Sequence, residues 1–257
     1  MEELNYQHVE KQIIHWLRKK VEEAGARGAV VGLSGGIDSS VTAVLAQKAF
    51  GENVLGLILP CYSSSQDLKD ATMLADEFSL DYQIKKLDSL LEEFLQIMEG
   101  SPEKAGDCSL EIANVKPRLR MTVLYYYAAR LNYLVLGTDN WSELRVGYFT
   151  KHGDGGVDLA PLGRLVKTEV RQLASYLGIP EKIINKTPSA GLWEGQSDEK
   201  ELGMAYSQLD RYLLTGEAEP EVKRRIQELE AKNRHKLAPL PHPERKQLIG
   251  REITKDK

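Results

Sequence analysis

The sequence has few cysteines, no long apolar run and no excess of basic residues. Its two cysteines, Cys61 and Cys108, lie far apart, so neither a disulfide framework nor a zinc cluster is expected. No apolar stretch approaches the roughly 18 residues that a membrane span requires. The first residues are acidic, whereas a signal peptide begins with basic ones. We therefore expect a soluble protein of a reducing compartment, the cytoplasm.

The balance of charges bears on the partners of the protein. The formal net charge is −4, from 34 Lys and Arg against 38 Asp and Glu residues, so composition gives no reason to expect a nucleic-acid partner. At 257 residues, 42% of them hydrophobic, the chain is long enough for one domain with a large core. We expect residues 1–257 to form that single domain.

Apolar runs of strand length alternate with segments whose apolar residues recur at helical spacing. This alternation predicts an α/β fold, a doubly wound, Rossmann-like parallel sheet with helices on both faces. A polar stretch rich in Gly, Ser and Pro, about 184–203, predicts a mobile flap. The expected strands are Ala29–Leu33, Asn53–Leu59, Tyr82–Leu87 and Tyr133–Thr138. The expected helices are Val9–Val21, Ile37–Leu45, Asp67–Phe78, Leu90–Met98, Arg118–Leu131, Thr168–Leu177 and Glu219–His235, with a loop at Gly100–Asp107 and a tail to residue 257.

The most informative segment is SGGIDSS, residues 34–40, which directly follows the first expected strand. A glycine turn between a strand and a helix leaves backbone N–H groups pointing one way, and the helix adds its positive dipole end. The serine hydroxyls can also donate to anionic oxygens. The segment therefore predicts a phosphate cradle. It has no lysine, so Asp38 would repel phosphate unless a divalent metal ion lay between them.

This segment resembles the SGGxDS loop of the N-type ATP pyrophosphatases, which share an adenine nucleotide alpha hydrolase-like fold. The resemblance implies cleavage of ATP between its α and β phosphates, with adenylation of a substrate oxygen. It leaves the substrate open. One alternative is an RNA-modifying enzyme of the same superfamily, whose only support is the basic run from Lys223 to Lys236. Another is an adenine-nucleotide sensor that binds ATP without cleaving it.

A second constellation gathers carboxylates after the fourth expected strand: Asp139, Glu143, Asp154 and Asp158. Carboxylates beside a phosphate site are unfavourable unless they hold a metal or a cationic nucleophile. Residue types alone favour a hydrated acidic loop with turn-forming Asp-Gly pairs.

Five motifs together resemble the ammonia-dependent NAD synthetases, over roughly residues 5–240. They are the loop at 34–40, NVKPRLRM at 114–121, the region 137–158, KTPSAGLW at 186–193 and GQSDE at 195–199. The resemblance implies that deamido-NAD is adenylated by magnesium-ATP and then amidated by ammonia, giving NAD, AMP and pyrophosphate. It also implies a homodimer. The chain has no region resembling a glutaminase domain.

The resemblance also implies residue roles. For ATP they fall on Gly32, Leu33, Ser34, Gly35, Gly36, Ile37, Asp38, Ser39, Thr138, Lys167 and Ser189. For deamido-NAD they fall on Arg118, Lys151, Asp158, His235 and Lys236, and for Mg²⁺ on Asp38 and Glu143. Lys167 and Asp154 are the expected catalytic residues.

Several points of this interpretation stay open. Asp154 can act as a general base toward ammonia or only as a carboxylate that binds ammonium. Leu237 stands where many relatives have arginine, and Pro117 where a smaller residue is usual. We expect Pro117 to lie in the first turn of a helix, where proline is tolerated. The apolar helix that carries Tyr125, Tyr126 and Tyr127 fits either a central core position or a dimer interface.

Overall fold

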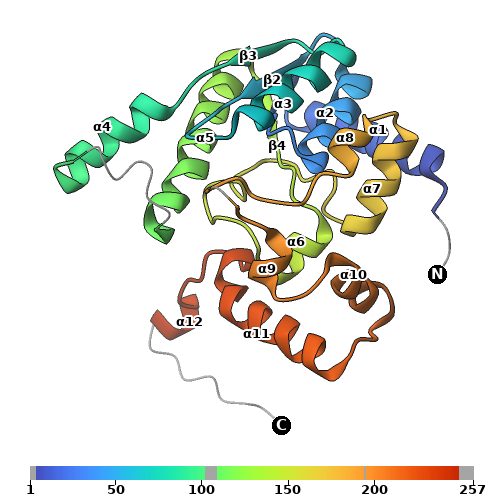
Figure 1. The fold of residues 1–257 in the computed structure, drawn as a ribbon, viewed down its shortest axis with the longest axis vertical. Coiled ribbons are helices and arrows are strands. Elements are labelled where there is room, and N and C mark those ends of the chain that lie inside the picture. Colours follow the sequence, from blue (N-terminus) through green and yellow to red (C-terminus); the bar gives the residue numbers. More distant parts are fainter. Residues whose placement is uncertain (1–3, 102–108, 194, 249–257) are drawn as a thin grey trace.

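The computed structural model describes residues 4–101, 109–193 and 195–248. Its centre is a parallel sheet with the strand order β3-β2-β1-β4 (Figure 1). The strands are β1 Gly28–Gly32, β2 Val54–Ile58, β3 Tyr82–Ile84 and β4 Tyr133–Leu136. After β3 the chain returns to place β4 on the opposite side of β1. The strand order therefore reverses at β1, and ligands of such sheets bind at the carboxyl ends of the strands beside that point.

Most helices pack around this sheet, and the last helices of the chain form a separate group (Figure 1). In chain order they are α1 Tyr6–Glu23, α2 Ile37–Phe50, α3 Ser65–Glu77, α4 Asp88–Glu99, α5 Leu110–Leu131, α6 Trp141–Val146, α7 Lys167–Tyr176, α8 Glu181–Ile184, α9 Asp198–Leu202, α10 Tyr206–Thr215, α11 Pro220–Leu237 and α12 Arg245–Leu248.

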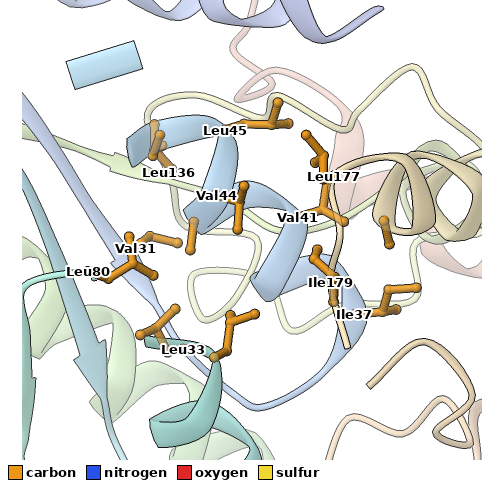
Figure 2. Packing of buried hydrophobic residues seen from close by; sticks show 14 of the residues in the cluster. Val31, Leu33, Ile37, Val41, Val44, Leu45, Leu80, Leu136, Leu177 and Ile179 are labelled. Atoms are coloured by element: carbon orange, nitrogen blue, oxygen red, sulfur yellow. The ribbon is translucent and has the colours of Figure 1, made fainter. Parts of the chain in front are cut away.

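Alternate residues of β1 enter two different cores, as expected when both faces of a sheet are covered. Val31 packs with Val41 and Leu45 of α2 in a core that also includes α1, α3 and α7 (Figure 2). Val30 points to the other face and packs among residues of α4 and α5. The predicted fold class is therefore confirmed, with helices on both sides of a parallel sheet.

A third, smaller core joins the C-terminal helices to α6. Ile226 of α11 and Leu209 of α10 are completely buried in it, together with Val146 of α6. Because α6 directly follows β4, this core fixes α11 near the carboxyl end of the sheet.

The predicted strands and helices are all present, with bounds that shift by a few residues. The largest difference is α5, which begins at Leu110 rather than Arg118. The placement of Pro117 in a first turn was therefore wrong, because it lies inside α5 and is buried. Proline has no amide N–H, so the helix lacks one backbone hydrogen bond at this position. The packing of α5 against the sheet outweighs that loss. The predicted loop at Gly100–Asp107 falls almost wholly outside the described residues, and Cys108 falls outside them.

The segment predicted to be a flap follows α8 and leads into α9. Lys186 at its start is hydrogen-bonded to α3, and Leu192 accepts a hydrogen bond from Lys116 of α5 at 2.6 Å. The flap is thus held on two sides in this conformation, and its mobility stays a prediction. None of the helices that the structure describes is both long and apolar enough to cross a membrane.

Candidate active site

A cleft of about 1160 Å³ opens at the carboxyl ends of β1, β2 and β4. The loop after β1 and the flap line it, and residues 225–236 of α11 form part of its wall. It lies beside the point where the strand order reverses, as the topology requires. Most of the site residues predicted from the sequence line this cleft. They are Gly32, Leu33, Ser34, Gly36, Ile37, Asp38, Ser39, Arg118, Thr138, Glu143, Lys151, Asp154, Lys167, Ser189, His235 and Lys236.

The loop after β1 has the geometry of an anion cradle. Gly35 has a φ of +76°, and a Cβ atom there would lie 2.4 Å from the carbonyl oxygen of Asp67. The Ser34 and Ser39 hydroxyls lie 2.9 Å apart, and Ser40 donates to the Gly36 carbonyl at 2.7 Å. These bonds hold the turn closed at the N-terminus of α2, where the helix dipole favours a negative ligand.

Lys167 joins three elements through one buried ammonium group. Its Nζ donates to Asp38 Oδ2 of α2 at 2.5 Å and to Glu143 Oε1 of α6 at 3.1 Å. Only 3% of the Lys167 side chain is exposed. The ring of Tyr206 lies 5.0 Å from the same nitrogen, in a cation–π position. Burial alone would lower the pKa of Lys167, but Asp38 and Glu143 raise it above its ordinary value, so the group remains a cation.

Glu143 is positioned by its own helix. Its backbone N–H donates to the Asn140 side chain and its Oε2 accepts from the Asn140 N–H, both at 3.1 Å, which forms a capping box. Burial raises the pKa of Glu143 to about 7, even though Lys167 opposes that shift. Tyr206 donates to Glu143 and to Asp198 at 3.2 Å each, so its hydroxyl links α6 to α9.

Asp38 and Glu143 satisfy the donor requirements of a magnesium site. Both place a carboxylate oxygen within 3.1 Å of Lys167 Nζ, so the two converge on one cation position at the edge of the phosphate cradle. Mg²⁺ commonly takes one or two carboxylates and completes its shell with water and phosphate. Within the described ranges, no group of three or more His, Cys, Asp and Glu side chains could hold a metal ion by itself.

Two further carboxylates deepen the negative charge of the cleft. Asp154 accepts the Thr150 N–H at 2.9 Å, and burial raises its pKa despite the nearby cations Arg120 and Lys236. Asp139 is also buried, and burial together with the Asp154 and Glu143 charges raises its pKa well above the ordinary value. Such a concentration of carboxylates attracts a cation and favours a shared proton.

Another part of the cleft wall carries cations held by backbone oxygens. Arg118 donates twice to the Lys151 carbonyl at 3.3 Å, and Lys151 donates to the His235 carbonyl at 2.9 Å. Lys236 donates to the Gly147 and Phe149 carbonyls at 2.7 and 2.8 Å. The structure therefore brings four of the five residues predicted for deamido-NAD together.

Asp158 is the exception among them, and it does not line the cleft. Its carboxylate accepts the Val135 N–H of β4 at 2.8 Å and the Tyr125 hydroxyl at 3.0 Å. In this chain Asp158 therefore ties the loop after Val157 to the sheet. Gly35 also lies outside the cleft lining, because it faces Asp67 of α3.

Sequence reasoning missed several residues of the site. Arg120 donates to the Leu59 carbonyl and the Ser63 hydroxyl at 3.1 Å each and lines the cleft beside Asp154. Tyr206 and Asp198 belong to the network around Lys167. Arg120 stands within the NVKPRLRM motif and could have been found there. Nothing local marks Tyr206, because its role depends on how α10 packs.

The parallel sheet, the glycine cradle and the paired acids define an α/β nucleotide-binding protein. The family model described as NAD synthase matches residues 9–240. The NH(3)-dependent NAD(+) synthetase of Carboxydothermus hydrogenoformans is 51% identical over 237 residues, covering 91% of this chain and 96% of that protein. The chain belongs to the NAD synthase family.

Two solved structures extend the comparison. The NMN synthetase from Francisella tularensis has a TM-score of 0.88 and 37% identity, over 94% of this chain and 99% of that one. The NH3-dependent NAD synthetase from Campylobacter jejuni, in complex with the nitrate ion, has a TM-score of 0.77 and 32% identity, over 94% and 100%.

Replacing Lys167 with methionine tests the buried ion group. Lys167→Met leaves Asp38 and Glu143 without their shared cation, so the free energy of unfolding should fall by about 3–5 kcal/mol in urea denaturation. The matched control is Lys48→Met, which removes an exposed partner of Glu10 and should cost no more than about 1 kcal/mol. Equal stability of the two variants would contradict the structural role of Lys167.

Proposed function

We propose that the chain is an ammonia-dependent NAD synthetase. Magnesium-ATP adenylates the nicotinate carboxylate of deamido-NAD, and ammonia then displaces AMP to give NAD. The observation that carries this proposal is the 51% identity, over almost the whole of both chains, with a protein of that name. The phosphate cradle also supports it, because the Asp38 and Glu143 carboxylates converge at its edge, where a cation bound to the ATP phosphates would lie.

The adenylation step uses the cradle and Lys167. A carboxylate is a poor electrophile, so its oxygen must first become a leaving group. It attacks the α-phosphorus of ATP, the bond to the β-phosphate oxygen breaks, and pyrophosphate leaves. The N-terminus of α2 and the serine hydroxyls at 34 and 39 bind the charge that develops on pyrophosphate. ATP contacts at Thr138 and Ser189, which both line the cleft, are part of the proposal.

A magnesium ion fits the acid pair beside the cradle. Asp38 and Glu143 would hold the ion, which supplies positive charge to the phosphate oxygens when bound. Lys167 occupies the position between the two carboxylates in the present structure. It keeps them close together, and it can donate to a phosphate oxygen once another cation compensates the acids.

The amidation step belongs to the acidic part of the cleft. Ammonia is mostly ammonium at neutral pH, and Asp139 and Asp154 attract that cation. Ammonium must lose a proton before its nitrogen lone pair attacks the acyl carbon. Asp154 can accept the proton, because burial raises its pKa toward that of a useful base. The flap covers the cleft and limits hydrolysis of the acyl-adenylate.

The anionic parts of deamido-NAD fit the cationic wall. Arg118, Lys151 and Lys236 suit its pyrophosphate, with His235 beside them. Asp158 keeps its assignment as a substrate residue only if its bonds to Val135 of β4 and Tyr125 of α5 exchange for substrate contacts.

The likeness to a structure named NMN synthetase supports a second candidate substrate. Nicotinate mononucleotide has the same reacting carboxylate as deamido-NAD and lacks the adenylate half. That structure has the same architecture as this chain, with a TM-score of 0.88 over 94% of the chain. The chemistry of both steps would be unchanged, and only the contacts along the cationic wall would differ.

A cytoplasmic homodimer is part of the same proposal. On α5, Tyr126 is 59% exposed and packs edge-to-face on Tyr127, so a large aromatic side chain stands on the outer face of that helix. A second copy is a suitable cover for it. The low cysteine content agrees with a reducing compartment.

The deciding experiment measures nucleotide products with purified protein and magnesium-ATP. Deamido-NAD or nicotinate mononucleotide is supplied with ammonium or with glutamine. We expect NAD, AMP and pyrophosphate in equal amounts from deamido-NAD and ammonium, and little product from glutamine. A higher kcat/KM for the mononucleotide would favour the second candidate. ATP that binds but is never cleaved would indicate a sensor, and cleavage only with tRNA an RNA-modifying enzyme.

The role of Asp154 is tested by Asp154→Asn, which keeps the shape and removes the charge and the base. If Asp154 accepts the proton, kcat should fall by about 10²- to 10⁴-fold. If it only binds ammonium, the KM for ammonium should rise with a smaller change in kcat. Asp76→Asn, at an exposed position on α3, is the control. Unchanged kinetics of Asp154→Asn would exclude both roles.

The cradle is tested by Gly35→Ala. A methyl group there meets the Asp67 carbonyl at 2.4 Å, so the loop must shift and the KM for ATP should rise by about one to two orders of magnitude. Gly178→Ala is the matched control, because its φ is +79° but a Cβ atom has nothing within 4 Å. Both variants carry the same backbone strain, so equal kinetics would show that the close approach to α3 does not matter.

A further inference from the structure

Lys186, at the start of the flap, has contacts that none of the roles above requires. Its Nζ donates to Asp67 Oδ1 at 2.6 Å, to Asp70 Oδ2 at 2.9 Å and to the Gly35 carbonyl at 3.2 Å. One ammonium group thus contacts the flap, the first two turns of α3 and the phosphate cradle. The side chain lines the cleft, so it lies beside the polyphosphate position rather than on the outer surface.

The two acids that Lys186 contacts lie where their negative charges would repel the phosphates of ATP. The Asp67 backbone lies against the cradle, since its carbonyl oxygen would be 2.4 Å from a Cβ atom at Gly35. Its side chain also lines the cleft. Asp70 is one turn further along α3, with only 2% of its side chain exposed. Two carboxylates this close to a polyphosphate would repel it, and partial burial strengthens the repulsion.

Lys186 provides the compensating charge. Burial alone would lower the pKa of Lys186, but the hydrogen bonds to Asp67 and Asp70 raise it above its ordinary value, so the group stays protonated. Asp70 has additional partners on its other oxygen, Lys182 at 2.8 Å and Gln66 at 2.7 Å. The hydrogen bonds of the Asp67 carboxylate in the described part of the chain come from Lys186 alone. Lys186 is therefore the cation in direct contact with Asp67, while Arg120 acts on that carboxylate electrostatically without a hydrogen bond to it.

We infer that Lys186 is a positioning residue for ATP: it neutralises Asp67 at the edge of the cradle and fixes the Gly35 carbonyl, so that the polyphosphate can enter. The inference rests on the proposed function, because it takes ATP as the ligand of the cleft. It also gives the flap a role in ATP binding, since the flap carries this charge to the cradle only in the conformation in which Lys186 reaches α3.

The test measures the dissociation constant of magnesium pyrophosphate and of the α,β-methylene analogue of ATP by calorimetry. Lys186→Met should weaken both by about tenfold or more, because an uncompensated carboxylate then faces the phosphates. Lys186→Arg keeps the charge and should restore most of the affinity. Lys182→Met is the matched control, because it removes the other lysine partner of Asp70 at a side chain 56% exposed, and it should bind like wild type.

The double variant Lys186→Met with Asp67→Asn separates charge compensation from a purely structural tie. If Lys186 acts by neutralising Asp67, removing that carboxylate should recover most of the lost affinity. The KM for ATP should follow the same order, while the KM for deamido-NAD should not change. Thermal unfolding of each variant in the absence of ligand checks that the fold persists.

Three results would overturn the inference. They are wild-type affinity in Lys186→Met, no recovery in the double variant, and an equal rise in the KM of both substrates. A failure of the proposed function is a different observation: wild-type protein that binds pyrophosphate and forms no NAD. In that case the order of pyrophosphate affinities among the variants still decides the role of Lys186.

Discussion

The buried ion group around Lys167 is the constraint on which the rest of the site depends. It joins the first turn of α2 to α6 and α7, and through Tyr206 it also reaches the C-terminal helices. A buried charge is tolerable only when it is paired and hydrogen-bonded. The packing of these elements therefore also determines where the Asp38 and Glu143 carboxylates lie. Asp38 is oriented by two residues that are distant in the sequence, Lys167 at 129 positions and Asn140 at 102 positions.

The sheet brings the segments of the site together. All its strands end at the same edge, and the reversal of strand order beside β1 leaves space there for a ligand. The cradle, the acids after β4 and the flap are each attached directly to that edge or to helices packed on it. Helix α11 then supplies the cationic side from a separate small core.

Local patterns allowed the cradle, the strands and the fold class to be predicted, because each depends on residues that are neighbours in the sequence. The start of α5 could not be predicted from the sequence. Locally, Pro117 favours a helix that begins near it, but packing on the sheet extends α5 back to Leu110. The same limit applies to partners. Lys186 meets Asp67 across 119 positions, and the Asp158 carboxylate turned out to bond to β4, a choice that residue type alone does not reveal.

The bonds that Asp158 and its neighbour make to β4 have a consequence for assembly. Strand β4 is the last of the sheet, and an outer strand with open N–H and C=O groups is a template for pairing with another chain. Here the Val135 carbonyl accepts from Asp158 and Leu159 of the chain itself, and Gly137 donates to Leu159. The β4 border of the sheet is thus covered by the chain's own loop. Copies of this protein that meet at this border must therefore do so through side chains rather than by adding a strand to β4.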